Sequence, residues 1–236
     1  MESSLNEKIV SRVQALLAKA ESTTYPEEAE ALVAKAQELM ARYAIGDAVA
    51  QQRRASGARP AMRTLKVEAP YARAKISLLT QIGHANVVQV VFNGMFEATL
   101  FGFDADLEVV ELLFASLLVQ ATSAMLRVPR ENTGGQVKAF RHAFLIAYAR
   151  RIGERLREAR AAAQGEAESD LGVALVPLFE ARRAAIDARV HEEFPHLSTQ
   201  RTSVSHYGGY GAGRAAADRA NIGTKGLRGT GRALAR

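Results

Sequence analysis

The 236-residue sequence contains no cysteine and no tryptophan. The absence of cysteine excludes disulfides, thiol nucleophiles and cysteine-based zinc sites. The N-terminus has neither a cationic start nor an apolar run, so it does not predict a secretory signal peptide. The most apolar stretch, Val109 to Val119, includes Glu111 and is too short to span a bilayer. We therefore expect a cytoplasmic protein without a membrane partner.

The charge of the chain is unevenly distributed. The formal net charge is +6, and residues 201–236 carry all of it, because they hold seven Lys and Arg residues against one acid, Asp218. Residues 1–200 sum to zero. Residues 201–236 also hold eight of the 18 glycines. A neutral body followed by a cationic, glycine-rich end suggests a polyanionic partner such as DNA or RNA.

Residues 1–46 predict a helical hairpin. Apolar residues recur at three- and four-residue spacing over 5–20 and again over 29–43. Pro26 fits the first turn of the second helix, where a missing N–H donor costs nothing, and Gly46 fits its end. Residues 47–62 lack periodicity, so we expect a linker there.

Residues 63–196 predict an α+β domain. Strands are expected at 64–69, 87–92 and 96–101, with Asn93-Gly94 as a hairpin turn. Helices are expected at 71–84, 105–127, 136–163 and 171–194. Asp104 is the expected cap of the second of these, and Pro177 is expected to kink the last or delay its start. The predicted fold class is α+β and mostly helical: a helical hairpin, a small sheet packed by long helices, and an extended basic tail over 197–236.

The hairpin sequence, LLAKAEST from Leu16 and EEAEALVAKAQELM from Glu27, resembles the family of the domain of unknown function 2786. Two later segments, AKISLLTQI from Ala74 and FRHAFLIAYARRIGERL from Phe140, resemble the uncharacterised domain that often follows it in bacterial and phage proteins. The segment YGAGR from Tyr210 resembles the usual end of such chains. The resemblance supports these element boundaries and a link to phages or mobile elements. It implies no established activity and no site residues.

Three late histidines, His191, His196 and His206, are the candidate metal ligands. The segment His191-Glu-Glu-Phe-Pro-His196 is similar to a zinc-binding HExxH, but its histidines are five residues apart and Pro195 interrupts the helix. Ligation from one helix face needs a spacing of four. A loop site using all three stays open, and some relatives accompany a zinc-protease-like domain. The alternative interpretation is three surface histidines near a helix end.

Other patterns give weaker indications. The carboxylates Asp104, Asp106, Glu108 and Glu111 have the chemistry to bind Mg²⁺ or to act as acid and base, but acids also suit the first turns of a helix. The glycine-rich segment 208–214 lacks the Gly-Lys-Ser/Thr ending of a phosphate loop. No nucleophile is accompanied by a base and an orienting group. We therefore expect no cofactor, and the balance favours a non-enzymatic protein.

The basic tail holds the candidate nucleic-acid-binding residues. Arginine donates two parallel hydrogen bonds to phosphate, and tyrosine stacks on bases. These candidates are Arg201, Tyr207, Tyr210, Arg214, Arg219, Lys225, Arg228, Arg232 and Arg236. A second basic surface is expected on helix 136–163, from Arg141, Arg150, Arg151, Arg155, Arg157 and Arg160, partly neutralised where Glu154 and Glu158 pair with Arg150. The competing interpretations are a solvated chain end and an exposed helix side.

Three functions follow from these patterns. The leading hypothesis is a non-enzymatic nucleic-acid-associated protein that binds phosphates with low sequence selectivity. The second is an assembly module whose helical hairpin docks on a protein partner within a virion or ribonucleoprotein. The third is a metal-dependent hydrolase that uses the late histidines or the acidic cluster.

Overall fold

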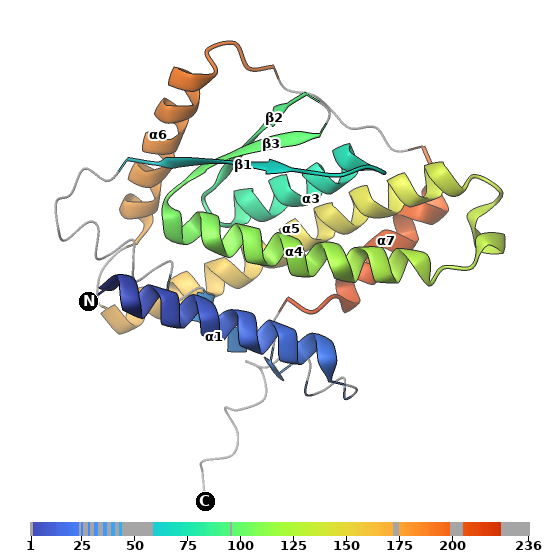
Figure 1. Cartoon of the computed structure of the whole chain (residues 1–236), viewed down its shortest axis with the longest axis horizontal. Helices are drawn as coiled ribbons and strands as arrows, with labels where there is room; N and C mark the ends of the chain where they lie inside the picture. The colour runs from blue at the N-terminus through green and yellow to red at the C-terminus, as the bar shows by residue number, and fades with distance from the viewer. Residues whose placement is uncertain are drawn as a thin grey trace, which may run out of the picture. The chain divides into compact units, whose positions relative to one another are not determined.

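The structure is a computed structural model of the full chain. It describes residues 2–23, 25, 59–94, 96–171, 175–198 and 205–222, together with separate positions between 28 and 43. The chain divides into two compact units, the larger of which spans Gln51–Ala220, and each is described by itself. Its elements are mostly helices, with a small three-stranded antiparallel sheet (Figure 1). The predicted α+β class is therefore confirmed.

The N-terminal unit begins with α1 (Glu2–Ser22), which carries the predicted apolar stripe. Val13, Leu17 and Ala20 of this stripe are buried. The positions described between 28 and 43 are helical, as predicted for the second helix. Glu28 ties the two segments together, because it accepts a hydrogen bond from the Thr23 hydroxyl at 2.7 Å and pairs with Lys19 at 3.1 Å. Gly46 and residues 47–58 of the predicted linker lie outside the described residues.

The sheet of the larger unit has the strand order β1-β3-β2 and is antiparallel throughout. Its strands are β1 (Ala61–Lys66), β2 (Gln89–Asn93) and β3 (Glu97–Gly102). The predicted boundaries of β1 were wrong: it starts within the predicted linker and ends three residues before Ala69. Ala61 pairs with Gly102 and Lys66 with Glu97, so the register with β3, rather than local alternation, sets both ends.

The predicted turn between β2 and β3 is confirmed, with a longer loop. Asn93 and Glu97 form the last pair, and Gly94 adopts a positive φ of 73°. The Asn93 side chain donates to the Thr99 hydroxyl at 2.8 Å, which anchors the loop to the central strand. The strand expected from Val87 begins only at Gln89, because Val87 itself adopts a left-handed φ of 56° in the turn that precedes it.

Helices cover both faces of the sheet. On one face, Phe194, the residue after α6, packs edge-on against Phe101 of β3, with the ring centroids 5.9 Å apart. The next residue, Gly102, faces the opposite side of the sheet, where a Cβ would lie 3.3 Å from Leu107 of α4. The central strand β3 is therefore buried almost throughout. The helices of this unit are α3 (Ala72–Ala85), α4 (Asp104–Leu126), α5 (Val137–Leu171), α6 (Val176–Glu193) and α7 (Tyr207–Arg219), with a 3-10 turn η1 (Arg130–Thr133) before α5.

Helix α4 differs from the prediction in its cap and its length. Its N-cap is Phe103, and Asp104 makes no capping hydrogen bond because its carboxylate accepts from Arg63 at 3.0 Å. By length and composition alone, α4 is apolar enough to cross a membrane, although the apolar stretch Val109 to Val119 within it is shorter. A core helix passes the same test, and Leu107 and Leu117 of α4 are fully buried.

Helix α5 continues beyond residue 163, where its end was predicted, and ends at Leu171. Its last turns are held by local bonds, because the Ser169 hydroxyl donates to the Gly165 carbonyl at 3.0 Å. Glu168 then accepts the backbone N–H of Leu175 at 2.7 Å, just before α6. Helix α6 begins at Val176 with Pro177 in its first turn. Of the two predicted effects of Pro177, the later helix start is therefore confirmed and the kink is not.

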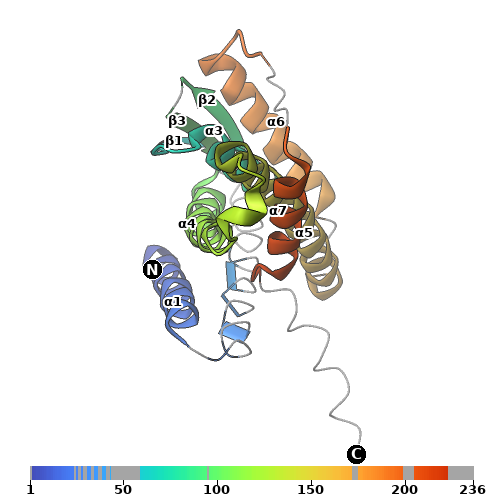
Figure 2. The same cartoon turned by 90° about the vertical axis from the view of Figure 1, so that its right-hand side faces the viewer.

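The extended tail predicted over 197–236 is wrong for residues 207–219, which form α7 alongside α5 (Figures 1 and 2). The glycines permit this contact. A Cβ on Gly213 would collide with the Phe144 carbonyl oxygen and lie 2.8 Å from its carbonyl carbon, and one on Gly209 would lie 3.0 Å from the Phe140 carbonyl carbon. Residues 199–204 and 223–236 of the predicted tail lie outside the described residues.

We predict that Gly213→Ala destabilises the larger unit by about 2 kcal/mol, because the added methyl group forces α7 away from α5. Gly211→Ala is the matched control: a Cβ at that position meets nothing within 4 Å, and alanine is the better helix former. Urea unfolding followed by circular dichroism measures both. Equal stability of the two variants would contradict the close packing of α7 on α5.

Candidate nucleic-acid interface

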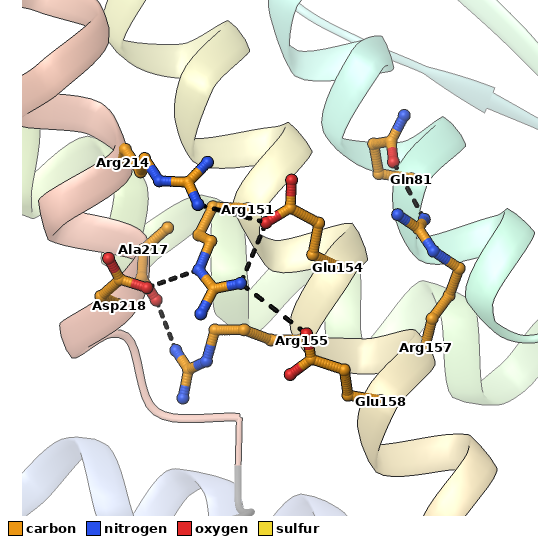
Figure 3. Close-up of polar contacts among 9 residues, drawn as sticks. All are labelled: Gln81, Arg151, Glu154, Arg155, Arg157, Glu158, Arg214, Ala217 and Asp218. Atoms are coloured by element: carbon orange, nitrogen blue, oxygen red, sulfur yellow. Dashed lines mark hydrogen bonds and ion pairs between the residues drawn. The ribbon is translucent and has the colours of Figure 1, made fainter.

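Helix α7, which carries part of the predicted basic tail, is linked to α5 by Arg151 (Figure 3). The Nε of Arg151 donates to Asp218 of α7 at 2.5 Å, and its Nη1 donates to Glu154 at 2.9 Å. Glu158 lies 3.9 Å from the same nitrogen, and Arg214 of α7 approaches Glu154 at 3.7 Å. The predicted pairing of Glu154 and Glu158 with Arg150 was wrong, because these acids face the side of α5 on which α7 packs.

The Arg151 network fixes the charge of Asp218. The hydrogen bond from Arg151 and its positive charge lower the pKa of the Asp218 carboxyl, and Arg214 adds to the effect. Asp218 is also the sole acid of residues 201–236. Its negative charge is therefore directed toward α5.

Arg155 holds the C-terminal end of α7. Its guanidinium is buried and donates from Nη1 to the Ala217 carbonyl and, at 2.7 Å, to the Ala220 carbonyl. The last carbonyls of a helix lack partners within the helix, and a cation there also complements the helix dipole. Burial lowers the pKa of Arg155, and the neighbouring Arg151 lowers it further. Arg155 therefore belongs to the α5–α7 contact and not to an exposed basic surface.

The N-terminal end of α7 is held by His206, one of the predicted metal ligands. Its Nδ1 accepts the Gly209 N–H at 3.0 Å, and its Nε2 lies 3.2 Å from the Thr133 carbonyl, which can only accept. The ring also packs edge-on against Phe140 at 5.3 Å. Both ring nitrogens are thus used in capping and docking α7.

The described residues do not support the predicted metal site. Among them, no group of three or more histidine or acidic side chains is placed to hold a metal ion. His191 lies in the last turn of α6, and His196 follows in the turn after Pro195. Both are exposed side chains.

The acidic cluster at the start of α4 has a structural use. Arg63 of β1 bonds Asp104 at 3.0 Å and Glu111 at 3.3 Å, which ties the strand to the helix. Asp106 is buried and pairs with the buried Arg182 of α6 at 2.6 Å. The Arg182 guanidinium also lies 3.8 Å from the ring centroid of Phe103. These contacts favour the structural interpretation of the cluster.

The predicted nucleic-acid-binding residues fall into two groups. Of those described, Tyr207 is 97% exposed at the start of α7, Tyr210 is half-buried, and Arg214 and Arg219 are exposed. The others lie outside the described residues: Arg201, Lys225, Arg228, Arg232 and Arg236. Sequence reasoning missed the role of His206 and Arg155 at the ends of α7. The spacing of four between Gly209 and Gly213 was the available signal for a close helix contact.

We predict that Arg155→Gln lowers the free energy of unfolding by about 2 kcal/mol, because the shorter side chain leaves the buried carbonyls at the end of α7 without their charged donor. Arg150→Gln is the matched control, since Arg150 is an exposed residue of the same helix. Urea unfolding measures both variants. If Arg150→Gln lowered the free energy of unfolding as much, the loss would be due to the removed charge and not to the contacts with the carbonyls.

We also predict a pH signature for Asp218→Asn. Because the folded protein lowers the pKa of Asp218, the charged form stabilises the fold above the ordinary aspartate pKa of about 3.9, and that stability is lost as the pH falls through the lowered value. The side chain is half-exposed, so the variant should be less stable at neutral pH by under about 1 kcal/mol. Unfolding at a series of pH values should show this difference vanish in acid. A constant difference would contradict the ion pair.

Comparison with known proteins bears on the N-terminal hairpin. No curated protein and no solved structure matches the chain. The family match does not extend to the later segments that resemble the domain following the hairpin. Residues 8–46 match the family described as "Protein of unknown function (DUF2786)", which confirms the resemblance seen in the hairpin sequence.

Proposed function

We propose that this protein is a non-enzymatic nucleic-acid-associated protein that binds the phosphate backbone through its C-terminal cations. One observation carries the proposal. Asp218 is held by Arg151, and no acid follows it in the sequence. The segment from Arg219 onward therefore contains five cations and no acidic side chain of its own: Arg219, Lys225, Arg228, Arg232 and Arg236.

The chemistry of these residues suits phosphate. A Lys or Arg that neutralises a backbone phosphate releases a condensed counterion, and this release drives binding whatever the base sequence. Contacts to phosphate position a protein on a nucleic acid but carry little sequence information. The proposal therefore includes low sequence selectivity.

An exposed aromatic side chain at the start of α7, Tyr207, also supports the proposal. Tyr207 is almost fully exposed at the start of the helix, which suits stacking on an unpaired base. Arg214 is the weaker phosphate candidate, because it already approaches Glu154 at 3.7 Å. The proposed interface thus relies on Tyr207, Arg219 and the cations that follow.

The test neutralises four cations, Lys225, Arg228, Arg232 and Arg236, to glutamine in the full chain. This design keeps α7, which packs on α5 and would be lost if residues 201–236 were deleted. Binding of mixed-sequence duplex DNA is measured by fluorescence anisotropy over a range of salt concentrations. If all four cations contact phosphates, the slope of log K against log[salt] should become shallower by about 3 to 4.

The control neutralises four exposed cations elsewhere, Lys66, Arg73, Lys138 and Arg150, and so makes the same change in net charge. Its salt slope should stay close to that of the unchanged protein. If the salt slope became equally shallow in both variants, the effect would reflect net charge and not the C-terminal cations. An unchanged slope in the C-terminal variant would reject the proposed interface, and self-association that survives nuclease treatment would favour an assembly module instead.

A further inference from the structure

A second group of basic side chains lies on the larger unit where α3 ends. It consists of His84 of α3, Arg157 and Arg160 of α5, and Arg183 of α6, and we call it the cationic cluster. It is separate from the contact of α7 with Arg151 and Arg155. The sequence placed Arg157 and Arg160 on a second basic surface, but it did not predict His84 or Arg183 as members of a site.

Two polar residues of α3 and its cap bring this cluster together. Arg157 Nη1 donates to Gln81 Oε1 at 3.3 Å, as Figure 3 shows, and Arg160 Nη1 donates to Asn86 Oδ1 at 3.4 Å. Asn86 is itself held by its Nδ2, which donates to the Ile82 carbonyl at 2.9 Å. The two arginines are therefore bound to residues that lie on either side of His84 in the sequence.

Arg160 is the least exposed member of the cluster. Its guanidinium stands 4.9 Å from the ring centroid of Phe179 in α6, which joins the third helix to the group. Its Nη2 is buried and has no hydrogen-bond partner among the described residues. A buried hydrogen-bond donor of this kind is costly to leave without an acceptor.

The positive charges of the cluster act on one another. Burial lowers the pKa of His84, and the charges of Arg157 and Arg183 lower it further. Burial also lowers the pKa of Arg160, where the carboxylate of Asp106 opposes the effect and Arg183 adds to it. Like charges held close together raise the free energy of the site, and a bound anion relieves this repulsion.

Nearby acids do not neutralise the exposed members. Glu180 and Asp187 lie one turn before and one turn after Arg183 on α6 and are exposed. Among the described residues, neither Arg157 nor Arg183 forms an ion pair with a carboxylate, and His84 makes no side-chain hydrogen bond. The cluster therefore presents two guanidinium forks and an imidazole to an incoming group.

We propose that the cationic cluster is a phosphate-binding site that takes a backbone phosphate of the nucleic acid. The identity of this ligand rests on the function proposed above, whereas the phosphate chemistry rests on the cluster alone. Two arginine forks suit the oxygens of one phosphate or of two successive ones, and the imidazole supplies a further donor. The folded unit then contacts nucleic acid in addition to the C-terminal cations.

The first experiment compares two double variants of the full chain. Arg157→Gln with Arg183→Gln removes the two exposed arginines of the cluster, and Lys138→Gln with Arg150→Gln removes two exposed cations of α5 outside it. With a mixed-sequence single-stranded oligonucleotide, the cluster variant should make the slope of log K against log[salt] shallower by about 1.4, whereas the control should leave the slope unchanged. Thermal unfolding establishes that both variants are folded.

The second experiment uses inorganic phosphate and the nuclear magnetic resonance signals of the five histidines. Phosphate should raise the pKa of His84, because its negative charge favours the imidazolium, while sodium chloride at equal ionic strength should not. His142, His191, His196 and His206 serve as internal controls. In the variant Arg157→Gln with Arg183→Gln, the response of His84 to phosphate should be lost, and its pKa without phosphate should rise toward the ordinary value.

The two experiments separate the two proposals. A His84 response to phosphate in a protein that binds no oligonucleotide would support the phosphate site and overturn the nucleic-acid role. Oligonucleotide binding with an unchanged salt slope in the cluster variant and no His84 response to phosphate would overturn the site and leave the C-terminal interface standing. If His84 does not respond to phosphate and the protein binds no oligonucleotide, both proposals are overturned.

Discussion

The close contact between α5 and α7 is the constraint on which the rest of the larger unit depends. Gly209 and Gly213 let the two backbones approach, and Arg155 supplies a charged donor to the carbonyls at the end of α7. Once α7 is fixed there, Asp218 falls within reach of Arg151. The Asp218 carboxylate is then used within the fold, and no acidic residue follows it in the sequence. A packing contact between backbones therefore determines how charge is presented at the C-terminal end.

The elements with strong local signals could be predicted from the sequence, and α7 could not. The apolar stripe of α1 and the Asn93-Gly94 turn are encoded within a few residues. Helix α7 contains glycines, each of which costs a helix about 1 kcal/mol relative to alanine. Helix α7 is stabilised by close packing of its glycines on the backbone of Phe140 and Phe144 and by the hydrogen bonds from Arg155. These partners are distant in the sequence, so no local pattern reveals them. Local sequence therefore predicts an extended tail for this glycine-rich segment, whereas Gly209 and Gly213 serve the packing of α7 on α5.

The same limit applies to the candidate site, because counting charges does not show where guanidinium groups point. Helix α5 was expected to present a single basic face. In the structure, Arg155 turns inward to α7 and Arg160 turns inward to Phe179, while Arg157 remains exposed beside Gln81. The excess charge of residues 201–236 was visible in the sequence, but the cationic cluster joins residues from three helices. Its members become neighbours only when α3, α5 and α6 pack together.

The two proposed contacts also differ in what they select. In the proposed function, the cations that are close in the sequence after Arg219 would respond to the density of negative charge along a nucleic acid. The cationic cluster differs, because Gln81 and Asn86 hold Arg157 and Arg160 in place and so would fix the position of the proposed phosphate on the folded unit. A fixed site favours a backbone whose phosphates have the matching spacing and exposure, whatever its bases. Discrimination among nucleic acids by backbone form, with little discrimination by sequence, is therefore the selectivity that this arrangement of charges supports.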